Sequence, residues 1–246
     1  MPQATPNAAP ATAALEWPPL VRGRLIKRYK RFLADVELDD GRAITAHCPN
    51  SGSMTGCKTP GQPVFLSQND NPKRKLKFTW HMIEMPTSLV GINTQVPNRL
   101  VTRSITAGCI DALQGYEKIT AEVTVNTHSR LDLKLTGPEK PDCYVEIKNC
   151  TLVEEGVALF PDAPTARGRK HLQELIRLKA AGHRAVIFFL VQRTDARAFA
   201  PAVHIDPEYG RGLWEAADAG VEILVYDVII DPHTITLNKP LPYDPA

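Results

Sequence analysis

Three polar residues near the middle of the chain have the types and spacing of a metal-dependent phosphodiesterase site. Asp132 interrupts a run of alternating leucines at positions 131, 133 and 135, and Glu146 and Lys148 lie two positions apart in the next strand-like segment, residues 143–152. Side chains alternate between the two faces of a strand, so the leucines are expected to share one face and Asp132 to point from the other. If the two strands are neighbours, Asp132, Glu146 and Lys148 lie on one face together.

Two converging carboxylates supply oxygen ligands to a hard cation such as Mg²⁺ or Mn²⁺ and leave other coordination positions to water and phosphate. Such a cation activates a bound water and neutralises charge on a phosphodiester. The sequence therefore predicts Asp132 and Glu146 as metal ligands, and Lys148 as a third catalytic residue beside the same phosphate. The alternative is a cross-strand charge network on an exposed sheet face, which contributes little stability. An acid-x-Lys pattern also occurs at Asp132 and Lys134, so this pattern alone does not decide between them.

Basic residues follow at the start of a helix predicted over residues 165–181. Arg167, Arg169, Lys170 and His171 fall in its first turns. Cations there oppose the helix dipole, and a bound anion relieves that repulsion. We interpret Arg167, Lys170 and His171 as nucleic-acid contacts, although solvated side chains at a frayed helix start explain the pattern equally well. His171 is also compatible with a proton shuttle or a polar packing residue.

Composition places the chain among globular proteins of one large or two small domains. It has 246 residues, of which 43% are apolar and 23% charged, close to the average for such proteins. We expect no membrane-spanning segment and no secretory signal, because no apolar run approaches about 20 residues and the N-terminus lacks a basic region. Five scattered cysteines without a CxxC pair favour a reducing, cytoplasmic location. Residues 1–16, rich in Ala and Pro, are predicted to form a disordered tail.

Positive charge is concentrated in the first part of the chain. Residues 17–88 contain 12 Lys/Arg against 6 Asp/Glu, whereas residues 89–246 contain 17 against 20. Such a local excess beside aromatic residues suits a polyanion, although a solvated basic face is the alternative. The basic residues form two clusters, from which we predict these nucleic-acid contacts: Lys27, Arg28, Lys30, Arg31, Lys73, Arg74 and Lys75.

Short strands separated by turns dominate residues 17–88. Residues 24–38 are strand-like, and residues 39–41 have the hairpin signal Asp-Asp-Gly. Residues 43–48 are predicted to be the second strand of that hairpin. Further strands are predicted at residues 63–67, 77–85 and 89–94. Strands of this length and number favour a small barrel, of which the oligonucleotide-binding (OB) fold is one class.

Residues 89–246 mix helices and strands. Helices are predicted at residues 98–112, 165–181 and 207–219, and strands at residues 119–125, 130–135, 143–152, 185–191 and 221–230. The continuous apolar run at residues 185–191 is typical of a central strand buried on both faces. This order predicts a mixed α/β domain with right-handed crossovers between parallel strands.

Many short blocks of the sequence together carry a resemblance to a known family. The blocks are residues 28–37, 48–54, 70–76, 79–80, 91–94, 97–100, 129–132, 144–149, 158–163, 167–168 and 170–172. Together they resemble the sugar fermentation stimulation protein family of bacteria and archaea, and the resemblance covers about residues 20–242.

Membership of that family implies an OB-fold-like barrel over residues 17–88, followed by a domain over residues 89–246 that is similar to PD-(D/E)xK nucleases. It also implies non-specific DNA binding and a suggested regulatory role in sugar (maltose) metabolism. On this template Asp132 takes the first acidic position, and Glu146 and Lys148 take the E-x-K. In such nucleases the first helix often carries a Glu. The helix predicted here over residues 98–112 departs from this template, because its one acid, Asp111, lies near its end. Glu122 is a substitute candidate.

Two functional hypotheses follow from the residues and the resemblance. In the first, the chain binds DNA without sequence preference and carries an Mg²⁺- or Mn²⁺-dependent nuclease site. In the alternative, it is a non-catalytic DNA-binding regulator of sugar metabolism. Two carboxylates facing a polyanion would repel it unless a cation lay between them, which favours the first hypothesis.

Overall fold

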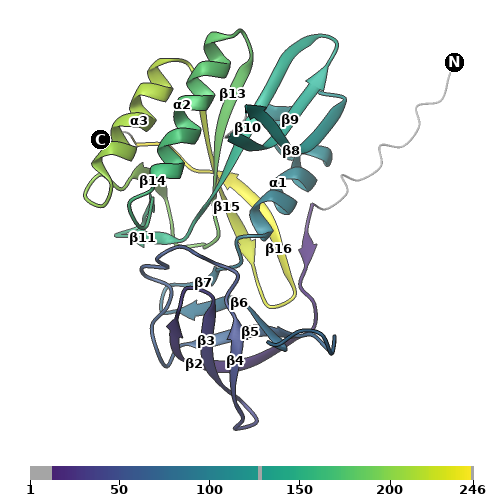
Figure 1. Cartoon of the computed structure of the whole chain (residues 1–246), viewed down its shortest axis with the longest axis vertical. Helices are drawn as coiled ribbons and strands as arrows, with labels where there is room; N and C mark the ends of the chain where they lie inside the picture. The colour runs from purple at the N-terminus through teal and green to yellow at the C-terminus, as the bar shows by residue number, and fades with distance from the viewer. Residues whose placement is uncertain (1–12, 127–128, 245–246) are drawn as a thin grey trace, which may run out of the picture.

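The two halves of the chain build separate sheets, with a barrel at one end of the molecule and a larger mixed sheet above it in Figure 1. The coordinates are a computed structural model that describes residues 13–126 and 129–244. Residues 20–91 form the barrel, and residues 96–240, together with the short strand β1 (Leu15–Glu16), form the mixed domain with its helices. The predicted order of a small β-barrel followed by a mixed α/β domain is confirmed.

The barrel is closed. Its strands follow the order β4-β3-β2-β5-β6-β7; an additional pairing of β4 with β6 closes a ring of five strands, and β7 pairs with β6 outside this ring. Buried side chains from alternating positions, such as Val36, Leu66 and Trp80, fill its interior. The strands are β2 (Leu20–Tyr29), β3 (Leu33–Leu38), β4 (Ala43–His47), β5 (Pro63–Gln68), β6 (Phe78–Met85) and β7 (Ser88–Gly91).

The first basic cluster lies in a hairpin that the sequence did not reveal. Residues 24–38 were predicted as one strand-like run, but the chain reverses at residues 30–32 between β2 and β3. Lys30 and Arg31 have positive φ values of 48° and 63°, a conformation that Gly or Asn usually provides. Because neither residue type is present, the turn has no sequence signal, and the prediction was wrong here.

A buried histidine makes the stability of the barrel sensitive to pH. His81 on β6 lies between Ser67, whose Oγ is 2.8 Å from Nε2, and Asn93, whose Nδ2 is 3.2 Å from Nδ1. Burial lowers the pKa of His81 to about 4, because the protein interior disfavours the charged imidazolium. Protonation of Nδ1 also removes the acceptor for the Asn93 amide.

We expect the free energy of unfolding to decrease as the pH falls from about 6.5, the pKa of an exposed histidine, to about 4, by about 3 kcal/mol in total. The unfolded chain binds the proton first in this range, so the loss is complete only below the folded pKa. Denaturant unfolding at several pH values measures the effect. His81→Gln should flatten this part of the profile, and an unchanged slope in that variant would contradict the assignment.

The larger sheet has the strand order β1-β16-β15-β13-β10-β9-β8. Strands β10, β13 and β15 run parallel, and their neighbours pair antiparallel. A small sheet of β11 (Leu152–Glu154), β12 (Val157–Phe160) and β14 (Ala198–Pro201) lies beside it. The strands of the larger sheet are β1 (Leu15–Glu16), β8 (Lys118–Asn126), β9 (Ser129–Gly137), β10 (Lys140–Cys150), β13 (Arg184–Val191), β15 (Glu222–Ile230) and β16 (Thr234–Pro240).

Helices cover both faces of this sheet. Helix α1 (Val96–Thr106) packs on one core cluster, while α2 (Ala166–Ala180) and α3 (Pro207–Asp218), side by side in Figure 1, pack on the other. The predicted central strand is confirmed, because the side chains of β13 alternate between the two clusters and residues 185–191 are all buried.

Local signals set the helix ends. The Thr165 side chain accepts a hydrogen bond from the backbone N–H of Gly168 at 3.0 Å and caps α2, as Thr does at helix N-termini. The first helix was predicted over residues 98–112 but ends at Thr106, and Gly108, with φ of 77°, follows it. A short 3₁₀ turn, Asp111–Leu113, comes next.

Both predicted domain limits shift. Strand β7 pairs with β6, so the barrel extends through Gly91, beyond the predicted limit at residue 88. At the N-terminus, Leu15 pairs with Ile235 of β16 and is buried. The predicted disordered tail is therefore wrong for residues 13–16, because an apolar pair anchors them to the sheet, and residues 1–12 lie outside the described part of the chain.

None of the helices within the described ranges is long and apolar enough to cross a membrane.

Candidate active site

Strands β9 and β10 bring the predicted acids together. The antiparallel register pairs Leu133 with Val145, so Asp132 and Glu146 follow at the next positions of the two strands. Lys148 lies two residues further along β10. Neighbouring antiparallel strands of this register place such side chains within reach of one another, and the site therefore forms where β9 leaves the ladder.

The leucines of β9 do not share one face, contrary to the prediction. Leu133 and Leu135 pack in the cluster under α1, whereas Leu131 packs in the cluster under α2. Strand β8 changes faces at the same level, between Ile119 and Val123, and Glu122 between them has a positive φ of 54°. This local break in the alternation of β8 and β9 turns Asp132 toward the edge where α1 begins.

Asp132 is held by two hydrogen bonds. Its Oδ1 accepts from the Asn98 amide of α1 at 2.7 Å, and its Oδ2 accepts from the backbone N–H of Ile147 at 2.7 Å. Burial and the nearby charge of Glu146 raise the pKa of Asp132 above its ordinary value, against the effect of these bonds. The two carboxylates are thus close enough to repel each other.

Glu146 and Lys148 meet a histidine from α2. Lys148 Nζ lies 2.6 Å from Glu146 Oε1 and 3.3 Å from His171 Nδ1, and His171 Nδ1 also contacts Glu146 Oε1. Burial alone would raise the pKa of Glu146, but the hydrogen bond with His171 and the charge of Lys148 outweigh it, and this pKa is lowered. Glu146 is therefore held ionised in a buried position.

One oxygen of Glu146 is left open. Lys148 and His171 both contact Oε1 of Glu146. The other oxygen, Oε2, is buried and has no hydrogen-bond partner among the described residues. A buried carboxylate oxygen without a partner is costly. A carboxylate oxygen without a hydrogen bond can serve as a ligand for a hard cation.

The site opens into a cleft of about 800 Å³ between the barrel and the mixed domain. The carboxylates and Lys148 lie on the wall from the mixed domain, together with Arg167 and His171. The opposite wall comes from the barrel, through Arg28, Arg31, Lys58 and the loop at residues 50–53. The lining carries five Lys and Arg side chains against three acids, the third being Asp162, and this excess of positive charge suits a phosphate-containing ligand.

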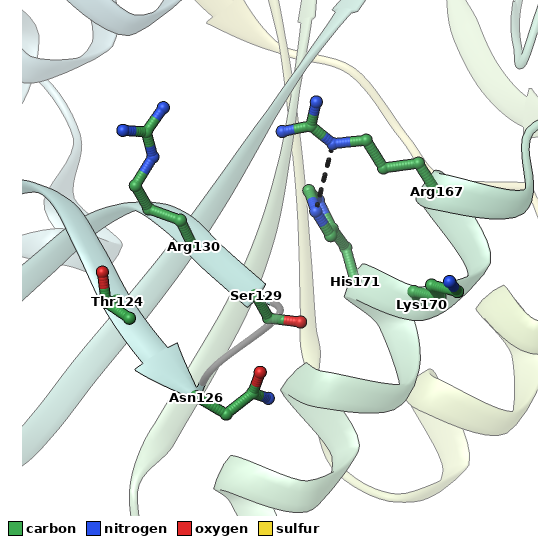
Figure 2. A pocket seen from close by; sticks show the side chains of 7 residues that line it. All are labelled: Thr124, Asn126, Ser129, Arg130, Arg167, Lys170 and His171. Atoms are coloured by element: carbon green, nitrogen blue, oxygen red, sulfur yellow. Dashed lines mark hydrogen bonds between the residues drawn. The ribbon is translucent and has the colours of Figure 1, made fainter.

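The predicted basic residues separate into groups. Arg28, Arg31, Arg167 and His171 line the cleft, and Lys170 lines an adjoining pocket (Figure 2). The remaining predicted contacts line neither space: Lys27, Lys30, Lys73, Arg74 and Lys75. Lys27 instead lies 3.6 Å from Asp35, and Arg74 donates to Thr79 at 3.1 Å. Charge clustering in the sequence thus did not distinguish cleft residues from other surface residues.

Arg28 supports the wall of the cleft with its own hydrogen bonds. Its Nη2 atom lies 2.8 Å from the carbonyl oxygens of Arg31, Asn50 and Gly52. These contacts tie the β2–β3 turn to the loop at residues 50–53. The Arg28 guanidinium therefore stabilises the fold through these three hydrogen bonds, whereas the sequence predicted a phosphate contact.

We expect Arg28→Ala to lower the free energy of unfolding by about 2 kcal/mol, because charged donors to carbonyls contribute more than neutral ones. Arg28→Lys should recover only part of this loss, since an ammonium group does not reproduce the planar fork. Denaturant unfolding measures both, with the exposed Lys27→Ala as the control. Wild-type stability combined with weakened DNA binding would instead make Arg28 a direct phosphate contact.

Two residues of the site were not among the residues predicted for it, although both fall in blocks that carry the family resemblance. The side chain that α1 contributes to the site is Asn98, whereas the sequence offered only Asp111 as an acid of that helix. The substitute candidate Glu122 lies outside the cleft, where it forms an ion pair with Arg130 at 3.0 Å. Asp162 lines the cleft and accepts a hydrogen bond from the backbone N–H of Met54 at 2.7 Å. Both Asn98 and Asp162 contact elements that are distant in sequence, so the fold is what shows that they belong to the site.

Family models match both halves of the chain. The model described as SfsA N-terminal OB domain matches residues 26–92, and the one described as Sugar fermentation stimulation protein RE domain matches residues 95–234. These limits agree with the barrel and the mixed domain of the structure.

Close relatives cover almost the whole chain. The sugar fermentation stimulation protein homolog of Geobacter sulfurreducens is 56% identical over 91% of this chain and 96% of its own length. That of a Shewanella species (strain MR-4) is 48% identical over 92% of this chain and 97% of its own length.

A solved structure has the same fold. SfsA of Pyrococcus furiosus, solved in complex with Ca²⁺, is 27% identical and superimposes with a TM-score of 0.86, covering 95% of this chain and 99% of that one. With this fold, both family models matched and relatives above 50% identity along nearly its full length, the chain belongs to the sugar fermentation stimulation protein family.

Proposed function

We propose that this protein binds DNA without sequence preference in the cleft between its domains and cleaves phosphodiesters there with Mg²⁺ or Mn²⁺. The observation that carries the proposal is the pair Asp132 and Glu146, which converge in a cationic cleft where Glu146 Oε2 is buried and has no hydrogen-bond partner among the residues that the structure describes. The order of an acid, an E-x-K and a basic helix, which resembles PD-(D/E)xK nucleases, supports it.

The residues fit a hard divalent cation. The raised pKa of Asp132 reflects burial and repulsion by Glu146, and a cation bound between two carboxylates removes such repulsion. In residues 13–126 and 129–244 no group of three His, Cys, Asp or Glu side chains has the spacing of a metal site. The chain would therefore offer two carboxylates and leave other positions to water and phosphate, a pattern typical of Mg²⁺.

The related Pyrococcus protein gives independent support, because it was solved in complex with Ca²⁺. Calcium prefers oxygen ligands, as Mg²⁺ and Mn²⁺ do. A family member that binds a hard cation makes cation binding by this chain a reasonable expectation.

Each polar side chain of the site has a distinct role in the proposal. A bound cation would supply Lewis acidity and an activated water. Asn98 holds Asp132 in place through its amide, and His171 holds Glu146 through Oε1, which leaves the buried Oε2 without a hydrogen bond from a described residue. Lys148 is 14% exposed, and its ammonium group is placed to stabilise charge on a phosphate bound beside Glu146.

The barrel supplies the opposite wall for the DNA backbone. Arg31 is exposed on the β2–β3 turn, and Lys58 donates to the carbonyl of Ser53 at 2.9 Å while lining the cleft. Phosphate contacts of this kind position a strand without reading its sequence. Binding is therefore expected to weaken steeply with salt concentration.

A panel of nucleic acids tests the proposal. Single-stranded DNA, duplex DNA and RNA are incubated with the full-length protein in Mg²⁺ or Mn²⁺, and binding of the same substrates is measured at several salt concentrations. We expect metal-dependent cleavage of at least one DNA form and binding of all DNA forms. DNA binding without any cleavage would favour the non-catalytic regulator of sugar metabolism, and absence of both would overturn the proposal.

A further inference from the structure

A second pocket adjoins the cleft on the far side of His171. It has a volume of about 510 Å³ and lies between the β8–β9 hairpin and helix α2 (Figure 2). We call it the hairpin pocket. It is lined by Thr124, Asn126, Ser129, Arg130, Arg167, Lys170 and His171.

The lining of the hairpin pocket is cationic. Its described side chains include Arg130, Arg167 and Lys170 but no carboxylate. Arg130 stands on the strand wall and Arg167 on the helix wall (Figure 2). The hydroxyl groups of Thr124 and Ser129 add further donors. Arginine, lysine and hydroxyl donors are the groups that proteins use for phosphate oxygens.

The charges are available to a ligand. Lys170 is exposed, and no hydrogen bond or ion pair joins it to another described side chain. Arg130 pairs with Glu122 at 3.0 Å, with the two side chains 57% and 63% exposed. An ion pair so exposed contributes little, so a phosphate can replace Glu122 at small cost.

The hairpin pocket and the cleft share two residues. Arg167 and His171 line both spaces. One edge of the His171 ring contacts Glu146 through Nδ1, and the other, Nε2, lies 3.5 Å from Arg167 Nε. A polyanion that occupies the cleft can therefore continue past His171 into the hairpin pocket without leaving cationic surface.

We propose, on the basis of the proposed function, that the hairpin pocket binds a second phosphate of the strand whose scissile phosphate lies at Asp132 and Glu146. The bound strand then runs from the barrel wall, over the carboxylates, to the β8–β9 hairpin. The second phosphate is either an internal phosphodiester or a terminal phosphomonoester, since both present the same oxygens to Arg130 and Lys170.

A binding experiment with full-length protein and Ca²⁺ tests this path. The probes are 12-nucleotide single-stranded DNAs with a 3′ fluorophore, with and without a 5′ phosphate. We expect the double variant Arg130→Gln/Lys170→Gln to lower affinity by roughly tenfold, since charged contacts are lost, and to make the salt dependence shallower. A loss confined to the 5′-phosphorylated probe identifies a terminal phosphate, and an equal loss for both probes identifies an internal one.

The control is Arg211→Gln on α3. Arg211 pairs with Glu208 at 3.1 Å and is 60% exposed, much like Arg130, but lines neither space. It should bind as the wild type does. A double variant that binds both probes with wild-type affinity and salt dependence would overturn this inference alone. Wild-type protein that binds neither probe would overturn the proposed function together with it.

Discussion

Replacement of Glu146 by glutamine is expected to lower metal-dependent cleavage by roughly 1,000-fold, the scale found when a group that stabilises transition-state charge is removed. The change keeps the shape of the side chain but removes the negative charge that a cation needs. Glutamine keeps an oxygen for the contacts that Glu146 Oε1 makes with Lys148 and His171, and Oε2 has no hydrogen-bond partner in the described part of the chain. Cleavage rates and Ca²⁺ affinity, measured on the same preparation, are both expected to fall.

Glu222→Gln provides the matched control. Glu222 lies on β15 of the same sheet and pairs with Arg184 at 2.5 Å, but it does not line the cleft. Its loss should affect stability and leave cleavage and cation affinity unchanged. Full cleavage by Glu146→Gln would show that Glu146 is not a ligand of the catalytic cation.

Lys148→Gln is expected to lower cleavage by about 100- to 1,000-fold while it leaves cation affinity close to that of the wild type. Lys148 Nζ lies beside Glu146 Oε1 at 2.6 Å, but His171 also holds that oxygen. Glu146 therefore remains fixed, and the loss falls on the charge that stabilises the phosphate. Cation affinity distinguishes the two variants, because only Glu146→Gln should weaken cation binding.

Lys134→Gln is a sharp control, because Lys134 belongs to the other acid-x-Lys match in the sequence. Lys134 pairs with Asp142 at 2.7 Å on the neighbouring part of the sheet and lines neither the cleft nor the hairpin pocket. It should cleave as the wild type does. Equal losses in Lys134→Gln and Lys148→Gln would point to a general effect of charge rather than to a site.

The sequence predicted the elements that carry the site because their signals are local. Alternation and apolar runs identified the strands around Asp132, Glu146 and residues 185–191, and apolar positions followed by Gly182 identified the helix that begins near Thr165. Glu146 and Lys148 share a face because side chains two positions apart point to the same side of a strand. Turn and strand spacing also predicted the barrel. These features depend on residues within a few positions of each other.

Elements whose stability depends on partners distant in sequence were missed. Strand β1 is two residues long and exists through its pairing with β16, and β16 itself has no strong apolar run. The turn at Lys30 and Arg31 was missed because its strained backbone is held by the barrel and has no residue-type signal. Tertiary pairing overrides local preference in such segments.

The sequence alone indicated the acid pair and its lysine as candidates for a site, and it predicted the barrel and the central strand. Tertiary structure decided the surroundings: Asn98 on Asp132, Arg28 in the wall of the cleft, and Arg130 beside α2. The face of Leu131 was decided in the same way, by a backbone break at Glu122 on the neighbouring strand. Periodicity describes one strand at a time, whereas a site is made where side chains of separate elements meet, and that depends on how strands twist and domains pack.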